Sequence, residues 1–420
     1  ELILNNVRWP QGTRIDNYAQ IAAVRLSEQR IVALLDKYGK DTVLACMDEM
    51  MDRTERAVRT TIATIPDGTY FGEAATDDDG TELDVPVWVR VEITKKDDTL
   101  HFDFSKSDKQ RKGFVNSIYN STYANALFGT FMFMDPDLGE YHNEGSLRPI
   151  TVEAPPGLVV SAQYPATVGA SPVSVGSQTL QAVMSAMSKA MPERAITSWG
   201  MRNGHYIFGT DPRTKERYVT TTFDMDGGTG AVAGFDGHEG PCGMGSLGTV
   251  NKGNVEELEM RFPWKYKRWE FVADSAGSGK WRGGSGMRWE VQNQGGEAGI
   301  ATGSSDGEIV RGPGALGGEP TRNNRGFLIR DGEESIVRGH RLYQLKTGDT
   351  ILKLTGGGAG VGNAAERDPE DVLWDVVNEY VSVEKAREIY RVAIDPIERR
   401  ILREETAKLR AKPLETTTQA

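Results

Sequence analysis

The chain has 420 residues, which is long enough for two or three domains with buried cores. Its 49 basic and 60 acidic residues give a net charge of −11, which argues against binding to nucleic acid or to an anionic membrane surface. Two cysteines exclude a disulfide framework and a cysteine-rich zinc module, and they fit a reducing, cytoplasmic location.

The N-terminal segment, residues 1–66, is predicted to be helical. Apolar residues such as Ile21 recur at helical spacing, Gly39 is expected to end a first helix, and Asp41 can cap a second one. Cys46 falls on the apolar stripe of the second helix and is expected to be inert core.

The next segment, residues 67–200, is predicted to be mixed α/β. Valine and isoleucine alternate with other residues over 85–93, which indicates a strand, and the apolar spacing over 178–190 predicts a helix. An acidic run at 77–80 lies between strand-like stretches. We interpret it as a hairpin turn rather than a calcium loop, because the distal ligand and the flanking helices of an EF-hand are missing.

Residues 201–365 combine short strand-like runs with most of the glycine clusters, which predicts a β-rich domain with elaborate loops. Residues 366–420 are predicted to be C-terminal helices, capped at Asp368-Pro369 and again at Asp395-Pro396. The expected fold class is therefore α+β, with a helical N-terminal segment, a β-rich Gly-loop central region and a helical C-terminus.

A glycine-rich run at 277–280 invites comparison with the phosphate loop of nucleotide-binding proteins. Such a loop needs a further glycine where Asp274 stands and a serine or threonine where Trp281 stands. We therefore expect no ATP binding by this chain itself.

The loop from Asp224 to Cys242 is the densest group of chemically active side chains. It offers oxygen, imidazole and sulfur ligands among six glycines, with a seventh at Gly243, which suits either a pocket or metal site or, alternatively, a solvated surface loop. The residues predicted to be catalytic are Asp224, Asp236 and His238.

A second group, around Asn143 and Arg148, is predicted to bind substrate. Arginine can hold a carboxylate or phosphate bidentately, although the same residue could tie a loop to the core. Asn116 and Arg282 complete the predicted substrate-binding set as residues that position loops.

An ordered series of short motifs over nearly the whole chain resembles the hydantoinase B/5-oxoprolinase family. The most distinctive are Pro66-Asp67-Gly68-Thr69-Tyr70, Asp103-Phe104-Ser105-Lys106-Ser107, Gly113-Phe114-Val115-Asn116, Asn143-Glu144-Gly145-Ser146-Leu147-Arg148-Pro149-Ile150, Asp274-Ser275-Ala276-Gly277-Ser278-Gly279-Lys280-Trp281-Arg282-Gly283-Gly284 and Gly356-Gly357-Gly358-Ala359-Gly360.

The resemblance implies a B-type subunit of an ATP-dependent cyclic amide hydrolase acting on hydantoin, 5-oxoproline or a lactam. An A-type partner subunit would bind ATP and Mg²⁺ and phosphorylate the small-molecule substrate. Two alternatives remain, a subunit of an acetone- or acetophenone-type carboxylase and a non-catalytic structural subunit.

The resemblance also implies a divalent metal, zinc or manganese, held by a His- and Asp-rich N-terminal part that this chain is expected to lack. No residue of the chain matches that part, so no metal ligand is assigned. The missing segment, or a separate chain that supplies it, is expected as a second partner.

Overall fold

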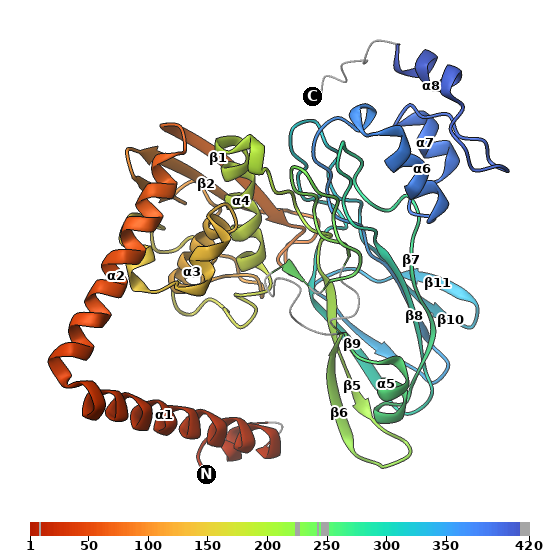
Figure 1. Cartoon of the computed structure of the whole chain (residues 1–420). Helices are drawn as coiled ribbons and strands as arrows, with labels where there is room; N and C mark the ends of the chain where they lie inside the picture. Colours follow the sequence, from red (N-terminus) through yellow and green to blue (C-terminus); the bar gives the residue numbers. More distant parts are fainter. Residues whose placement is uncertain (8–9, 223–226, 242, 245–251, 412–420) are drawn as a thin grey trace.

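The structure, a computed structural model, describes residues 1–7, 10–222, 227–241, 243–244 and 252–411 (Figure 1). Helices lie at both ends of the chain and sheets in its middle, so the α+β prediction is confirmed. Within these described ranges no helix is both long and apolar enough to span a membrane.

Two long helices form an arm at the N-terminus, and we call them the helical arm. Helix α1 spans Pro10–Tyr38 and helix α2 spans Lys40–Ala63, as the sequence predicted. Gly39 separates them with a φ of 82°, a conformation that glycine adopts without strain. Gly39 rather than Asp41 therefore occupies the cap position of α2, and Asp41 lies in its first turn.

The apolar residues of the helical arm are mostly exposed rather than part of a core. Figure 1 shows α1 extending away from the rest of the molecule, and Gly12 is its only buried residue. Ile21 and Val24 are exposed, and so is Cys46 on α2, which the sequence placed in the core. The spacing predicted the helices correctly, but no described element covers this apolar surface.

A four-stranded sheet with two helices follows the arm. The strand order is β1-β2-β3-β4, with β4 parallel to β3 and the other pairs antiparallel. Helix α4 packs closely on the sheet at Gly72. A Cβ at this position would lie only 2.0 Å from the Ala182 carbonyl oxygen, so a larger residue would not fit there. The elements are β1 (Gly68–Thr76), β2 (Val87–Lys96), β3 (Thr99–Asp103), α3 (Tyr119–Phe131), β4 (Ile150–Glu153) and α4 (Val175–Ala190).

Two further antiparallel sheets make up most of the second half. One has five strands in the order β11-β10-β13-β8-β7, and the other has four in the order β12-β9-β5-β6. Trp289 lies fully buried in the core that they share. The elements are β5 (Asn203–Thr210), β6 (Arg217–Thr222), α5 (Val255–Arg261), β7 (Trp264–Phe271), β8 (Met287–Asn293), β9 (Ala298–Ser305), β10 (Arg325–Arg330), β11 (Glu333–Ile336), β12 (Leu342–Leu345) and β13 (Thr350–Leu354).

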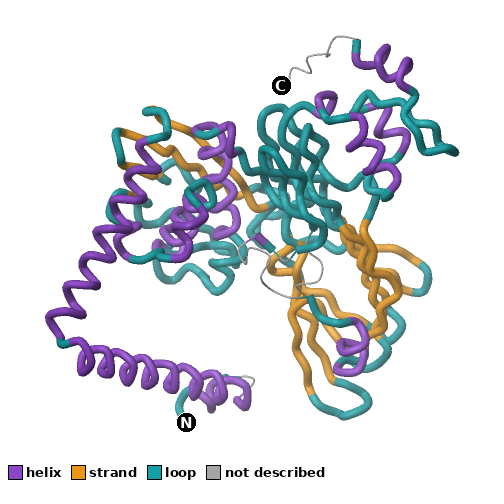
Figure 2. Tube along the Cα trace, in the orientation of Figure 1, coloured by secondary structure: helices purple, strands orange, loops and turns teal. Residues whose placement is uncertain are grey.

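Glycine-rich segments meet between α4 and these two sheets, and Figure 2 shows them as a dense group of loops. We call them the loop layer, which comprises residues 196–200, 227–238, 275–286, 311–321 and 355–362. Their backbones hydrogen-bond directly, for example Gly284 N to Thr229 O at 2.9 Å and Gly358 N to Gly284 O at 2.9 Å. A Cβ on Gly283 would lie 1.9 Å from the Gly358 carbonyl oxygen, so only glycine permits this approach.

Three short helices end the described chain, namely α6 (Pro369–Val377), α7 (Val383–Glu388) and α8 (Arg403–Arg410). Asp368 caps α6 by accepting a hydrogen bond from Glu370 N, which confirms that prediction. Asp395 instead caps a turn through Ile397 N and Glu398 N, and α8 begins only at Arg403. The second predicted helix start was therefore wrong.

Candidate functional site

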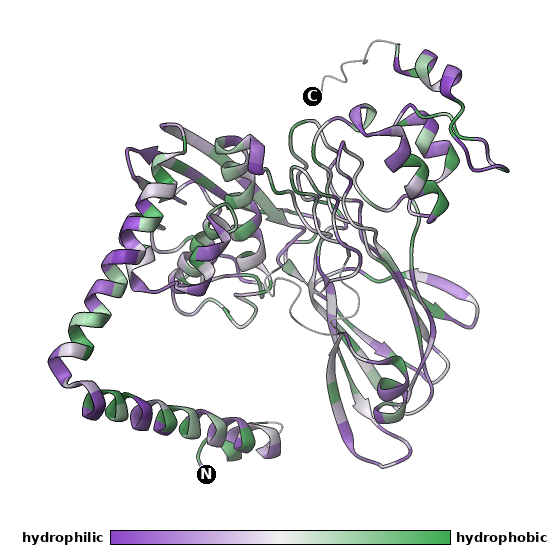
Figure 3. Cartoon of the chain, viewed as in Figure 1, coloured by the Kyte–Doolittle hydropathy of each residue, from purple (hydrophilic) through white to green (hydrophobic). Residues whose placement is uncertain are grey.

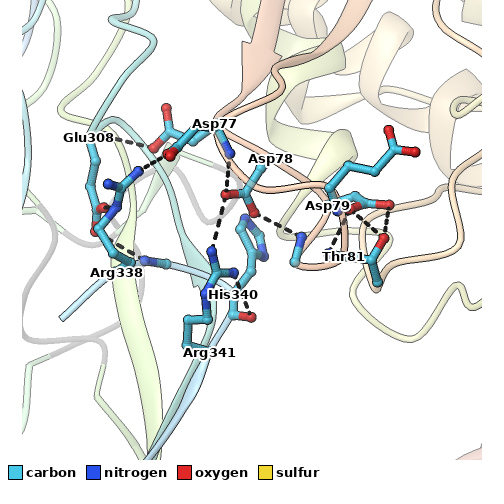
Figure 4. Close-up of polar contacts among 12 residues, drawn as sticks. Asp77, Asp78, Asp79, Thr81, Glu308, Arg338, His340 and Arg341 are labelled. Carbon is cyan, nitrogen blue, oxygen red and sulfur yellow. Dashed lines mark hydrogen bonds and ion pairs between the residues drawn. The ribbon is translucent and has the colours of Figure 1, made fainter.

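The acidic run at 77–79 lies at the junction between the first sheet and the strand-rich half (Figure 4). It connects β1 to β2, so the hairpin prediction is correct. The three aspartates are nevertheless buried, each at most 5% exposed, rather than solvated. Burial of three carboxyl groups requires compensating hydrogen bonds or charges.

Asp77 reaches across the junction to the segment after β9. Its carboxylate accepts hydrogen bonds from the backbone N–H groups of Glu308, Ile309 and Val310 at 2.7, 3.0 and 2.7 Å. Burial and the neighbouring charge of Asp306 raise the pKa of Asp77 to about 6. When two carboxyl groups lie together in a buried site, the negative charge of one makes ionisation of the other less favourable.

Asp306 is the partner carboxylate in this pair. It accepts a hydrogen bond from Thr76 and lies 3.3 Å from Nε2 of His340. Burial alone would raise the pKa of Asp306, but the hydrogen bonds with His340 and Thr76 hold it below its usual value. Burial likewise opposes charge on His340, yet Asp306 raises the pKa of that imidazole above its usual value. Both shifts favour the charged forms of the pair, carboxylate on Asp306 and imidazolium on His340.

The other two aspartates shape the connection itself. Asp78 accepts a hydrogen bond from Gly80 N at 2.8 Å and lies 3.6 Å from the Arg341 guanidinium. Asp79 accepts hydrogen bonds from Thr81 and, at 3.1 Å, from Gly113 N. Figure 4 shows these side chains with Arg338 and His340 at one seam between the two halves. These contacts hold the β1–β2 connection against the strand-rich half, and they leave no open reaction site among these side chains.

A buried lysine lies farther into the strand-rich half. Lys353 on β13 donates a hydrogen bond at 2.9 Å from Nζ to Oδ1 of Asn203 on β5, which joins the two sheets. Burial lowers the pKa of Lys353 to about 8, although the charge of Glu308 opposes this shift. Burial also raises the pKa of Glu308 above its usual value.

The predicted substrate-binding residues Asn143 and Arg148 both contact α2. Asn143 caps a short 3-10 helix and donates to Oγ1 of Thr54 at 2.9 Å. The Arg148 guanidinium pairs with Asp52 at 2.6 Å and Glu55 at 2.9 Å, and its side chain is 40% exposed. In these contacts both residues tie a loop to the helical arm, the alternative that the sequence left open for Arg148.

Asn116 is fully buried and organises its own loop. Its Oδ1 accepts from Arg111 N at 2.7 Å, and its Nδ2 donates to the carbonyl oxygens of Arg111, Gly113 and Thr167. The amide is thus used within the protein, and the role of Asn116 in positioning a loop stays a prediction.

Asp236 and Arg282 lie together in a network of ion pairs. Arg282 N donates to Asp236 Oδ1 at 2.9 Å, and the Arg282 guanidinium pairs with Asp375 at 2.8 Å. Asp236 in turn binds Arg367 through two hydrogen bonds of 2.7 and 2.6 Å. This network fastens the loop layer to the C-terminal helices.

The remaining predicted residues are His238 and Asp224. His238 is exposed, and its backbone N–H donates to Oγ1 of Thr229 at 2.7 Å. Asp224 lies outside the described residues. Among the described residues of the predicted set, Asn143 and Arg148 both contact α2, and Asp236 accepts a hydrogen bond from Arg282 with His238 two residues away in the same loop. Asn116 lies apart from both groups, and the functional roles remain predictions.

A cavity of about 330 Å³ lies between α4 and the loop layer. Residues of α4 and of the loop layer line it together: Gln181, Met184, Ser185, Ser188, Lys189, Pro192, Ile196, Ser198, Pro313, Gly314, Ala315 and Leu316. Its size is in the range of small-molecule sites, which occur preferentially between structural units.

A divalent metal would need several His, Cys, Asp or Glu side chains close together as ligands. Among the described residues no group of three or more His, Cys, Asp or Glu side chains could hold a metal ion. The aspartates of the junction bind backbone N–H groups and basic side chains instead. These residues do not fit the metal that the resemblance implies.

The sequence offers no functional prediction for Asp306 or His340, and it indicates only a turn at Asp77. Asp77 meets its partners more than 200 positions along the chain, so no local pattern reveals the pairing. The one available signal was the density of three consecutive aspartates at the end of a strand.

Comparisons with known proteins agree with this architecture. The family model of hydantoinase B/oxoprolinase matches residues 1–364. The chain is 32% identical over 403 residues to caprolactamase subunit beta of Pseudomonas jessenii, covering 94% of this chain and 68% of that protein.

Two solved structures resemble the chain. The ATP-dependent caprolactamase from Pseudomonas jessenii superimposes with a TM-score of 0.86 at 30% identity, over 98% of this chain and 71% of that chain. Nucleotide-free acetone carboxylase superimposes with a TM-score of 0.79 at 18% identity, over 95% of this chain and 59% of that chain, which shows a shared fold. The chain therefore belongs to the hydantoinase B/oxoprolinase family.

Proposed function

We propose that the chain is the B-type subunit of an ATP-dependent cyclic amide hydrolase. The observation that carries this proposal is the agreement with caprolactamase in both sequence and fold over nearly the whole chain. Hydantoins, 5-oxoproline and lactams share a ring amide, which is a poor electrophile. Phosphorylation of the amide oxygen by a partner would activate the ring carbon toward water.

ATP would bind to an A-type partner subunit together with Mg²⁺. The glycine-rich run at 277–280 supports this division, because its backbone N–H groups are already engaged. Gly277 N donates to Gly358 O at 2.8 Å, Ser278 N to Glu319, and Lys280 N to Gly362 O at 3.2 Å. A phosphate-binding loop needs such groups free to contact the phosphates. Dependence on ATP also supports a cytoplasmic location.

The divalent metal would be supplied by polypeptide other than the described residues, since those residues do not fit it. A bound metal supplies Lewis-acid activation of a carbonyl or of water. Among the chain's own residues we retain Arg148 and Asn143 as candidates for holding the substrate or its phosphate. Asp224, Asp236 and His238 remain candidates for lining the pocket, and Asn116 and Arg282 for positioning loops.

The test is an assay of the purified complex with its co-eluting partners. ATP hydrolysis is measured with hydantoin, 5-oxoproline and ε-caprolactam, and separately with acetone plus bicarbonate. Elemental analysis and mass spectrometry of the same sample identify the metal and the chains. We expect ring opening coupled to ATP hydrolysis and independent of bicarbonate.

Two other outcomes would overturn the proposal. Activity that requires a ketone and bicarbonate would identify a carboxylase subunit, for which the acetone carboxylase fold is the precedent. Activity in neither assay, with no metal in the complex, would identify a non-catalytic structural subunit.

A further inference from the structure

One side of helix α1 carries a regular series of residues that the described chain leaves exposed. Six positions, spaced alternately by three and four residues, form this series, which we call the contact stripe: Tyr18, Ile21, Arg25, Glu28, Val32 and Leu35. Positions with this spacing lie on one side of a helix and form the contact line of a two-helix coiled coil. Tyr18, Ile21 and Val32 are 62, 49 and 47% exposed, so this side of the helix is open to a partner.

The apolar positions of the contact stripe match a second copy that runs in the opposite direction. In an antiparallel pair of α1 helices centred between residues 26 and 27, Tyr18 faces Leu35 of the second copy, and Ile21 faces Val32 of the second copy. Each contact occurs twice, because a two-fold axis relates the two copies. The pair would therefore bury two apolar layers on either side of its centre.

The two charged positions of the stripe also match in this arrangement. At the centre of the pair, Arg25 faces Glu28 of the second copy, again twice. A parallel pair in register would instead place Arg25 beside Arg25 and Glu28 beside Glu28, and like charges that face each other at an interface are unfavourable. Polar residues at contact positions fix the register and orientation of paired helices. The charges therefore favour the antiparallel pair.

Further apolar residues lie along one flank of the stripe. Val24, Ile31 and Tyr38 each precede or follow the contact positions at helical spacing and are 47–70% exposed. In the antiparallel pair, Val24 would lie next to Ile31 of the second copy, which widens the apolar contact. Leu26 and Leu34 lie on the opposite side of α1 and would stay uncovered.

We propose that α1 pairs with α1 of a second copy of this chain as an antiparallel two-helix coiled coil centred between residues 26 and 27. Helix α1 extends away from the rest of the molecule, where a second copy can reach it (Figure 1). The occupant is a second copy because the apolar and charged positions of one stripe complement those of the same stripe reversed. The pairing is independent of the reaction that the protein catalyses.

Exchange of the two charges tests the pairing. Sedimentation equilibrium of the full-length chain should show a dimer with a dissociation constant of about 100 μM or tighter, as for a small interface. Arg25→Glu and Glu28→Arg each bring like charges together twice and should each weaken the dimer by about tenfold or more. A mixture of the two variants should associate again, because opposite charges then face each other. The double variant Arg25→Glu/Glu28→Arg should recover the dimer for the same reason.

Cysteine cross-linking tests the direction and register of the helices. Ile21→Cys/Val32→Cys should form a covalent dimer with oxidised glutathione, because these positions face each other in the antiparallel pair. Ile21→Cys alone should not, since the two copies of residue 21 would lie about 16 Å apart along the helices. The native chain, with Cys46 exposed, gives the background.

A matched pair of double variants separates the stripe from general surface hydrophobicity. Ile21→Gln/Val32→Gln should abolish the dimer. Leu26→Gln/Leu34→Gln removes residues of similar exposure, 50 and 46%, from the opposite side of the helix and should leave the dissociation constant unchanged. Circular dichroism checks that each variant is folded.

Four results would overturn the proposal. They are a native chain that stays monomeric at about 100 μM, charge variants that do not associate when mixed, cross-linking by Ile21→Cys alone above the native background, and equal effects of the two double variants.

Discussion

Asp77 shows how a single buried carboxyl group can make a junction sensitive to pH. It holds three consecutive backbone N–H groups of the opposite half, yet lies beside Asp306, whose charge opposes its ionisation. The pKa of Asp77 rises from 3.8 to about 6 on folding. Folding thus favours the protonated form, and this stabilisation is present below about pH 4 and lost as pH rises through about 6.

We therefore expect Asp77→Asn to flatten the pH dependence of stability. The free energy of unfolding of the native chain, relative to the variant, should fall by about 2–3 kcal/mol between pH 4 and pH 7, since each pKa unit corresponds to about 1.4 kcal/mol. Urea unfolding at a series of pH values measures the difference. Glu333→Gln, at an exposed carboxylate on β11, is the control and should leave the profile unchanged. Parallel profiles for the native chain and Asp77→Asn would contradict the assignment.

Arg148→Ala separates a functional role of Arg148 from a structural one. The side chain is 40% exposed, and exposed ion pairs contribute about 1 kcal/mol or less. We expect the melting temperature to change little while turnover of the complex falls. Arg56→Ala is the control. It removes an exposed ion pair with Glu49 on α2, the helix that Arg148 contacts, and should change neither the melting temperature nor the turnover. If the melting temperature collapses together with activity, Arg148 is structural.

At the scale of elements, helix α1 is notable because the described chain buries almost none of its side chains. In Figure 3 apolar and polar residues alternate along the side of α1 that faces the viewer. Ile15, Tyr18, Ile21, Val24 and Ile31 are all 47–70% exposed. So many large apolar residues exposed on one helix mark an interaction site or a risk of aggregation.

We expect polar substitutions on α1 to change association without changing folding. The double variant Ile21→Gln/Val24→Gln should keep its unfolding free energy within about 0.5 kcal/mol, because exposed positions contribute little. Sedimentation velocity should show less self-association than for the native chain. Val58→Ala on α2 is the contrasting control, since Val58 is fully buried and its loss should cost about 2 kcal/mol. A large loss of stability in the double variant would show that α1 packs against the body of the protein.

The same elements show what the sequence could and could not predict. Periodicity located α1, α2 and α4, and the Asp368-Pro369 pair located the start of α6, because these signals are local. The burial of Cys46 was predicted wrongly, since periodicity shows that a face is apolar but not what covers it. Asp77 and Asp306 could not be paired from the sequence, because only the complete fold brings them together.

At the scale of the whole molecule, the glycine clusters allow several segments to pack at very short backbone distances. The loop layer joins segments from four distant parts of the second half by backbone contacts that no side chain could allow. Ion pairs of Arg282 and Arg367 with Asp375 then fasten the C-terminal helices to this layer. The loop layer therefore connects α4, both large sheets and the C-terminal helices.

Gly283→Ala should be strongly destabilising. The added Cβ would lie 1.9 Å from the Gly358 carbonyl oxygen, a backbone atom that cannot rotate away. We expect a loss of about 3 kcal/mol or more in unfolding free energy, at or above the usual cost of overpacking. Gly139→Ala is the matched control, because nothing lies within 4 Å of its Cβ position and its stability should be unchanged. Equal melting temperatures of the two variants would contradict this account.

The interleaved loop layer also has a consequence for the order in which the protein acquires its structure. Segments around residues 230, 283 and 358 must come together from distant parts of the chain before all their mutual hydrogen bonds can form. Closing such long loops costs entropy before contacts repay it, so folding dominated by them is slow. The first sheet with α3 and α4 depends on closer partners in the chain and should gain protection from hydrogen exchange first. The loop layer would then be the last part to form, and the cavity beside α4 would be completed only at that step.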